Sequence, residues 1–137
     1  MASIFELGDI PGGLLPNVCT LAEVTNTATL TAAQSYSSIV RGIPTSTATY
    51  TTAAASAIIS AIGGDCAVGT CFRVVVLNAA ATAITITVGG GSGVTISGVA
   101  TIAQNASKEF IGYVTNVTAG SQAITLYGLG STGSAVA

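Results

Sequence analysis

The feature that most constrains the fold of this chain is an alternation of apolar and polar residues in its second half. In the segment AITITVGGGSGVTISGVATIA, residues 83 to 103, Ile and Val alternate with Thr and Ser on either side of a glycine run. Side chains two residues apart lie on the same face of a strand, so each half of this segment has one apolar face. The segment predicts two short β-strands joined by a glycine-rich hairpin turn.

The same period of two recurs often enough to predict five strands between residues 71 and 128. The apolar positions are Phe72, Val74 and Val76; Ile84, Ile86 and Val88; Val94 and Ile96; Phe110, Gly112 and Val114; and Ile124 and Leu126. Turn-forming residues separate these runs at 78–81, 89–93, 104–107 and 116–122. Short strands at such spacing are typical of a sandwich or barrel. We therefore expect residues 26–130 to form one mainly β domain, an antiparallel, jelly-roll-like β-sandwich.

A single short helix is expected before these strands. The run TAAASAIISAIGG, residues 52 to 64, places apolar residues at helical spacing, at Ala54, Ile58, Ile59 and Ile62. Thr51 or Thr52 is the expected N-cap, and Gly63 or Gly64 is expected to end the helix. Residues 26–42 are rich in Thr and Ser with irregularly spaced apolar residues, and we expect one or two strands there.

The two ends of the chain are expected to lie outside the sandwich. Residues 1–25 contain Pro11, Gly12, Gly13 and Pro16 between short apolar pieces, which indicates an extended N-terminal arm. A tail this apolar favours docking on a neighbouring molecule, and the residues expected to mediate assembly are Ile4, Phe5, Leu7, Ile10, Leu14 and Leu15. Residues 131–137 are expected to form a flexible C-terminal tail.

The chain carries very little charge. Only 6% of its residues are charged, against about 25% in typical soluble domains, while 50% are hydrophobic. Disordered chains combine low hydrophobicity with high net charge, so this one is expected to be ordered. Strand edges are normally protected by Lys, Pro or bulges, and here only Arg73 and Lys108 could serve for that purpose. Either a closed barrel or a partner must then cover the edges.

Composition also argues against nucleic acids and membranes as partners. The three basic residues, Arg41, Arg73 and Lys108, are scattered, whereas phosphate binding needs several cations on one surface. A spanning helix needs about 20 mainly apolar residues, and the longest helix-compatible apolar stretch covers only residues 53–62. The first residues carry Glu6 and Asp9 and no basic group, which does not match a secretory signal.

Cysteines and glycines provide the only motifs that resemble chemical sites. Cys66 and Cys71 form a C-x4-C pair, which fits either a disulfide or two small buried apolar residues. Zinc is not expected, because the chain has no His and Cys19 is far away in sequence. The Gly-rich run 89–93 is followed by strand residues and no Lys, so a turn is favoured over a phosphate-binding loop.

The sequence predicts that the protein is not an enzyme. Without His, a Ser or Thr nucleophile needs another base, and Lys108 is the single lysine. The carboxylates that acid–base or metal chemistry would require lie mostly in expected loops or the arm, at Glu6, Asp9, Glu23, Asp65 and Glu109. We therefore expect no catalytic residues, no bound metal and no cofactor.

Three segments together resemble a known structural module. They are TYTTAAASAIISAI, VGTCFRVVVLNAAATAITITVGGGSGVTISGVATIA and ASKEFIGYVTNVTAGSQAITLYGL, within residues 48 to 129. Their order is similar to that of a β-rich module in virion proteins of large double-stranded DNA viruses and tailed phages. In that module a small helix precedes a V-G-T/D-x-F strand, a glycine-centred hairpin and a closing strand pair with the pattern T-N-V-T-x-G-S-x-A-x-T-L-Y.

The resemblance implies a structural virion protein: a capsid decoration, minor capsid or fibre component, often a homotrimer. Its partners would be copies of itself and the major capsid protein or other virion proteins. Two alternatives are a glycan- or receptor-binding module, and a cellular surface filament subunit assembled by strand donation. The tyrosines available for stacking on sugars are Tyr36, Tyr50, Tyr113 and Tyr127. The low charge favours the structural role, since a binding tip needs a polar exterior.

Overall fold

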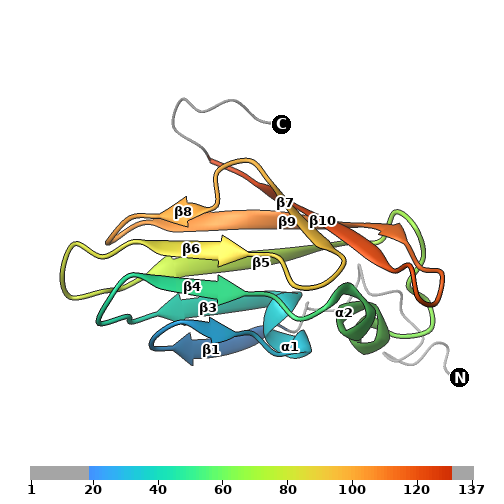
Figure 1. Ribbon diagram of the computed structural model, residues 1–137, viewed down its shortest axis with the longest axis horizontal. Coiled ribbons are helices and arrows are strands. Elements are labelled where there is room, and N and C mark those ends of the chain that lie inside the picture. Colours follow the sequence, from blue (N-terminus) through green and yellow to red (C-terminus); the bar gives the residue numbers. More distant parts are fainter. Residues whose placement is uncertain (1–18, 131–137) are drawn as a thin grey trace, which may run out of the picture.

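The computed structural model describes residues 19–130, which form two β-sheets and two short helices (Figure 1). The elements are, in chain order, β1 (Thr20–Val24), β2 (Ala28–Thr29), α1 (Ala32–Ser35), β3 (Ser38–Gly42), β4 (Ala48–Thr51), α2 (Ala55–Ile62), β5 (Cys71–Asn78), β6 (Ile86–Gly89), β7 (Val94–Ser97), β8 (Thr101–Ile102), β9 (Ser107–Asn116) and β10 (Ala123–Gly128). One sheet has six strands in the order β1-β3-β5-β9-β10-β7, and the other has four in the order β2-β4-β6-β8.

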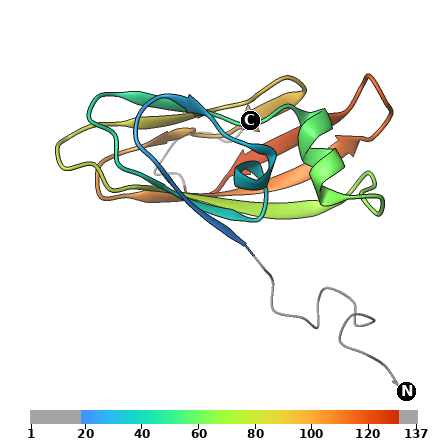
Figure 2. The ribbon, with the colours of Figure 1, turned by 90° about the horizontal axis from the view of Figure 1, so that it is seen from below.

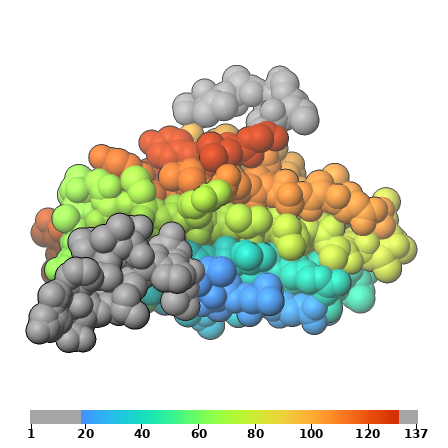
Figure 3. Space-filling view, turned by 180° about the vertical axis from the view of Figure 1, so that it is seen from behind, coloured from blue at the N-terminus to red at the C-terminus, as the bar shows by residue number. Residues whose placement is uncertain are grey.

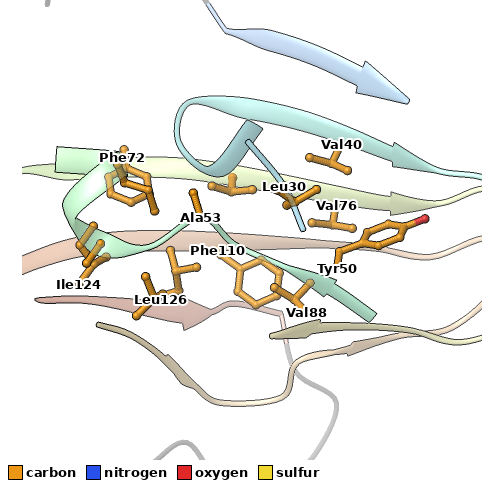
Figure 4. Packing of buried hydrophobic residues seen from close by; sticks show 14 of the residues in the cluster. Leu30, Val40, Tyr50, Ala53, Phe72, Val76, Val88, Phe110, Ile124 and Leu126 are labelled. Atoms are coloured by element: carbon orange, nitrogen blue, oxygen red, sulfur yellow. The ribbon is translucent and has the colours of Figure 1, made fainter. Parts of the chain in front are cut away.

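The two sheets face each other across one apolar core. Figure 2 shows the two layers edge-on, with α2 at one end of them. The alternation seen in the sequence directs one face of every long strand inward, so Val74 and Val76 of β5 and Phe110 of β9 are buried. Tyr50 and Val88 enter from the four-stranded sheet and meet the residues of the six-stranded sheet (Figure 4).

The first half of the chain winds around this core as a coil. From β1 to β6 each strand of the six-stranded sheet is followed by a strand of the four-stranded sheet, and α1 and α2 lie in the returning segments. Each circuit brings the chain back to the same sheet in the same direction. As a result β1, β3 and β5 pair in parallel, and so do β2, β4 and β6.

The second half closes the two sheets with antiparallel strands. After β6 the chain crosses to the far edge of the six-stranded sheet, where β7 pairs in parallel with β10. It returns to the other sheet as β8, which is antiparallel to β6, and then forms β9. Strand β9 lies between β5 and β10 and is antiparallel to both.

The mainly β prediction is confirmed, and the five predicted strands correspond to β5, β6, β7, β9 and β10. An antiparallel jelly roll is not confirmed, because five of the eight strand pairings are parallel. The predicted hairpin at residues 89–93 is wrong: β6 and β7 belong to different sheets, so the glycine run is a crossing between the layers. Sequence alternation reports which face is buried but not the direction of the neighbouring strand.

The prediction for residues 1–25 is wrong over its last part, which belongs to the sheet. Residues Thr20–Val24 form the edge strand β1, and Ala22 is buried in the domain. The backbone of β1 is paired with β3, and the carbonyl of Val24 accepts hydrogen bonds from the Ile43 N–H and the Tyr50 hydroxyl. The predicted assembly residues Ile4 to Leu15 and the predicted tail 131–137 lie outside the described residues.

The predicted helix is confirmed as α2, but its N-cap is not a threonine. Ala54 occupies that position and makes no side-chain cap bond, whereas Gly63 ends the helix at φ 110° and donates its N–H to the Ile59 carbonyl. Thr52 is buried instead and accepts a hydrogen bond from the Gly91 N–H. A second helix, α1, was not expected; its four residues are stabilised by a capping box between Thr31 and Gln34.

Tyr50 links strand β4 to the end of β1, and this contact makes stability depend on pH. Burial raises the pKa of the Tyr50 hydroxyl above its ordinary value of 10.0, so the unfolded chain loses this proton at lower pH than the folded chain. The stabilisation is therefore complete below pH 10 and is lost as the pH rises above it. We expect the free energy of unfolding, measured by urea titration between about pH 9 and about pH 11, to fall more steeply for the wild type than for Tyr50→Phe. Parallel curves would contradict this assignment.

Candidate functional site

The outer face of the six-stranded sheet collects most of the charge in the described chain. Residues 19–130 carry six of the eight charged side chains, and four of these project from this face. Glu23 on β1 is in register with Arg41 on β3, and their side chains form an ion pair. Arg73 on β5 and Glu109 on β9 form a second pair. Within each pair the positive and negative charges cancel, so these four side chains give the face no net charge.

Between and beside these pairs the outer face is apolar. Leu21, Ile39 and Val75 follow one another in register across β1, β3 and β5. Leu21 is 74% exposed, an unusual position for a leucine on the flat face of a sheet. Next to the row formed by Leu21, Ile39 and Val75, Ile111 of β9 is in register with Tyr127 of β10. Figure 3 looks onto this face, where the strands follow one another in bands from β1 to β10.

A groove of about 640 Å³ lies on this face. Its lining residues come from the start of β1 and from β3, β5 and β9: Cys19, Ser37, Ser38, Ile39, Cys71, Phe72, Arg73, Val75 and Ile111. Among the described residues of this lining, Arg73 is the charged one. The groove is therefore suited to apolar side chains and holds a guanidinium at its wall, and the described lining residues include no pair of groups that could act together as acid and base.

The outer face of the four-stranded sheet is different in chemistry. Thr49, Thr87 and Thr101 are in register across β4, β6 and β8, and Thr51 lies in the next row beside Gly89. No strand of this sheet carries a charged residue. Threonine favours strands through its branched Cβ. The threonine-rich alternation in the sequence is therefore explained by strand formation on this face, and no chemical site is needed to account for it.

The edges of the two sheets carry little of the protection that strand edges normally have. Arg73 lies on β5 and Lys108 on β9, which are both interior strands of the six-stranded sheet. Among the four edge strands of the described chain, β1 carries Glu23, and β2, β7 and β8 carry no charge and no proline. β2 and β8 are only two residues long, which limits pairing with another chain, whereas β1 and β7 have five and four residues.

Lys108, one of the two basic residues that the sequence made available for edge protection, is buried. It is only 7% exposed, and its Nζ donates to the carbonyl of Leu129, 3.3 Å away. The signal that could have shown its position is the alternation itself, because Lys108 is in phase with the inward residues Phe110 and Val114. Its contact ties the end of β9 to the segment after β10.

The structure separates the two cysteines considered for a disulfide. Cys71 lies on the outer face in register with Tyr113, and its thiol donates to the Gly69 carbonyl at 3.5 Å. Cys66 is half-buried and packs against the core. Both are free thiols, as is the exposed Cys19. The disulfide is thus not formed, and only Cys66 matches the alternative of a buried apolar residue.

The described residues bring no catalytic or metal-binding constellation together. Glu23 and Glu109 are held in ion pairs with arginines, and Asp65 lies in the loop between α2 and β5. Over residues 19–130, no group of three or more His, Cys, Asp or Glu side chains is placed to hold a metal ion. Neither of the two described helices is long and apolar enough to cross a membrane.

The four tyrosines considered for sugar stacking are also dispersed. Tyr50 is fully buried, and Tyr36 makes an edge-to-face contact with Phe72 at a ring distance of 6.2 Å. Tyr113 and Tyr127 are 38% and 40% exposed on the outer face of the six-stranded sheet. They belong to the same apolar face as Leu21 and Ile111, and they extend it toward β10.

Comparisons with known proteins add no assignment. No protein-family model, curated protein or solved structure matches the chain. The candidate site is therefore defined by its own geometry: a flat, largely apolar outer face with internally paired charges and a groove at its β1–β5 side.

Proposed function

We propose that this protein is a structural subunit that assembles through the outer face of its six-stranded sheet, as a virion component such as a capsid decoration, minor capsid or fibre protein. The observation that carries the proposal is the exposure of Leu21, Tyr113 and Tyr127 on a face whose charges are already paired. Contiguous exposed apolar surface is uncommon on monomeric proteins and marks interaction sites.

The charge arrangement supports burial of this face against another protein. An interface core is depleted in charged residues, and a buried unpaired charge is costly. On this face Glu23 and Arg41, and likewise Arg73 and Glu109, already compensate each other within one subunit. A neighbour can therefore cover the face without supplying matching charges. The two facing sheets then act as a β-sandwich module whose exterior is shared between subunits.

The virion assignment is supported by the resemblance of residues 48–129 to the β-rich virion module. Phe72 and Phe110, which carry part of that resemblance, are buried in the core, whereas the glycine run crosses between the sheets instead of forming the glycine-centred hairpin of the module. A homotrimer and contacts with a major capsid protein follow from the same resemblance.

A matched pair of substitutions tests the assembly surface. Leu21→Asp places a charge on the apolar face, whereas Val68→Asp makes the same kind of change at a residue that is 57% exposed in the loop before β5. We expect Leu21→Asp to weaken self-association by about tenfold or more, because burying the new carboxylate costs over 1.4 kcal/mol, and Val68→Asp to have little effect.

Sedimentation velocity over a range of protein concentrations measures this difference, and circular dichroism melts show that both variants keep their fold. Equal self-association of Leu21→Asp, Val68→Asp and the wild type would overturn the proposal.

A further inference from the structure

We propose that the edge strand β1 pairs antiparallel with β1 of a second copy of this chain, so that two six-stranded sheets join into one continuous sheet across a two-fold axis. This inference rests on the proposed function and names a contact through which two subunits join. Strand β1 is paired on one side, with β3, and Figure 3 shows it in blue at the border of the sheet.

The backbone of β1 offers hydrogen-bonding groups to a further strand. The Thr20 N–H donates to the Ser37 carbonyl, which fixes the side of β1 that faces β3. Along a strand the N–H and C=O groups of alternate residues point to opposite sides. Leu21 and Glu23 therefore direct their N–H and C=O groups away from β3. Within residues 19–130 no other strand pairs with β1 on that side.

These outward groups match a second copy of β1 best in one register. With Ala22 on the two-fold axis, all five residues of β1 overlap, and Leu21 of each copy lies opposite Glu23 of the other. Each such pair exchanges two backbone hydrogen bonds, so the symmetric contact has four. A slide of two residues in either direction leaves three residues overlapping, and one of these slides places two Glu23 side chains opposite each other, which is unfavourable.

The side chains of β1 fit the same register. A hollow of about 340 Å³ at this strand is lined by Leu21, Ala22, Glu23 and Arg41. In the proposed pair the second copy's Leu21 lies opposite Glu23 and diagonal to Leu21, so it covers this hollow. A leucine that is 74% exposed in the single subunit is thereby removed from water. Because Arg41 already pairs with Glu23, the contact needs no charge from the second copy.

Strand β1 also lacks the features that keep an edge from pairing. It contains no proline, no lysine and no inward-pointing charge, and its register with β3 runs through all five residues without a bulge. At the axis two Ala22 residues form a pair without backbone hydrogen bonds, where the chains come closest and small side chains fit. These features select β1 of a second copy, since an unrelated strand need not place a leucine at the hollow and a small residue at its centre.

Disulfide trapping between differently tagged chains tests both the contact and its register. All chains carry serine or alanine in place of Cys19, Cys66 and Cys71. One chain then carries Leu21→Cys and the other Glu23→Cys. Opposite residues of a hydrogen-bonded pair have Cα atoms about 5.5 Å apart, within the range of a disulfide. After mixing and oxidation with glutathione disulfide, we expect the mixed disulfide at a yield about tenfold above that of either chain alone, whose thiols are diagonal and about 7 to 8 Å apart.

Thr95→Cys in the same cysteine-free chain is the matched control for random collision. It places an exposed thiol on β7, the strand at the other edge of the six-stranded sheet. We expect its disulfide yield to be about tenfold below that of the mixed Leu21→Cys and Glu23→Cys chains.

A proline provides a readout that side-chain packing alone would not give. Glu23→Pro removes the outward N–H, whereas Glu23→Ala loses the same ion pair and keeps that N–H. Proline is tolerated in an edge strand where the missing N–H would face solvent. We expect the dissociation constant of the dimer, measured by sedimentation velocity, to be about tenfold higher for Glu23→Pro than for Glu23→Ala. Circular dichroism melts show that both variants remain folded.

A mixed disulfide yield no higher than that of Thr95→Cys would overturn the proposal, and so would equal dissociation constants of the two Glu23 variants. Preferred trapping of Leu21→Cys chains with one another would overturn the proposed register. Sedimentation of the wild type reports self-association separately. Oligomers without the mixed disulfide would refute the β1 contact and leave the proposed function standing, whereas a monomer would refute both.

Discussion

Gly91→Ala should lower the free energy of unfolding by about 3 kcal/mol, because the crossing between the two sheets has no room for a side chain. A Cβ at this position would lie 2.4 Å from the carbonyl oxygen of Thr52 and 2.8 Å from that of Ala53. Both atoms belong to the backbone of the segment between β4 and α2, so relief requires movement of the chain and not of a side-chain end. The Gly91 N–H also donates to the Thr52 hydroxyl, and Ala55 donates to the Ser92 carbonyl, so a shift disturbs several hydrogen bonds.

Gly64→Ala is the matched control for this change. A Cβ at Gly64 has nothing within 4 Å, and we expect a stability change of less than about 0.5 kcal/mol. Chemical denaturation of both variants measures the two values. Similar stability of Gly91→Ala and the wild type would show that the crossing is loosely packed, contrary to the structure.

Asn78→Ala should cost about 3 kcal/mol, since this buried amide joins the two sheets at one end of the core. Asn78 ends β5 and is 2% exposed. Its Nδ2 donates to the carbonyls of Ile84 and Ile102, at 2.7 and 2.9 Å, and its Oδ1 accepts from the Ala80 N–H. Alanine removes all three bonds and leaves buried backbone groups without this partner.

Asn116→Ala serves as the comparison, because the Asn116 side chain makes one turn hydrogen bond to the Thr118 N–H near the surface. We expect this change to cost about 1 kcal/mol or less. Urea denaturation of the two variants distinguishes them, and an equal loss at both positions would contradict the bridging role of Asn78.

The sequence predicted the buried face of the long strands well, because that face follows from side-chain period alone. Phe72, Phe110 and Leu126 are all in the core, as their alternation indicated. Asn78 and Lys108 are in phase with these inward residues, so the alternation indicates that both are buried. Their polar side chains made burial look improbable from the sequence. By contrast β2 and β8, with two residues each, are too short to show any period.

Strand order and direction could not be predicted in the same way. A strand with one buried face has the same pattern whether its neighbour is parallel or antiparallel, and parallel pairing here arises from the coil of β1 to β6 around the core. For the same reason the sequence could not show that Arg73 and Lys108, the two residues available for edge protection, lie on the interior strands β5 and β9.

The candidate surface was only partly visible in the sequence. The low charge of the chain predicted that subunits share surfaces. The ion pair between Glu23 and Arg41 could not be predicted, because it depends on a parallel register between residues 18 positions apart. The outward phase of Leu21 was hidden because residues 20–24 were assigned to the arm and not to a strand. The groove, which depends on β1, β3, β5 and β9 together, had no sequence signal.

Sedimentation equilibrium of the unmodified 137-residue chain at micromolar concentration shows whether the exterior of the protein is shared between subunits. We expect an oligomer whose mass is a multiple of 13.3 kDa and which dissociates on dilution or when Leu21 is replaced by Asp. A soluble species of 13.3 kDa at every concentration would show that the apolar face of the six-stranded sheet stays exposed to water and that the subunits do not share it.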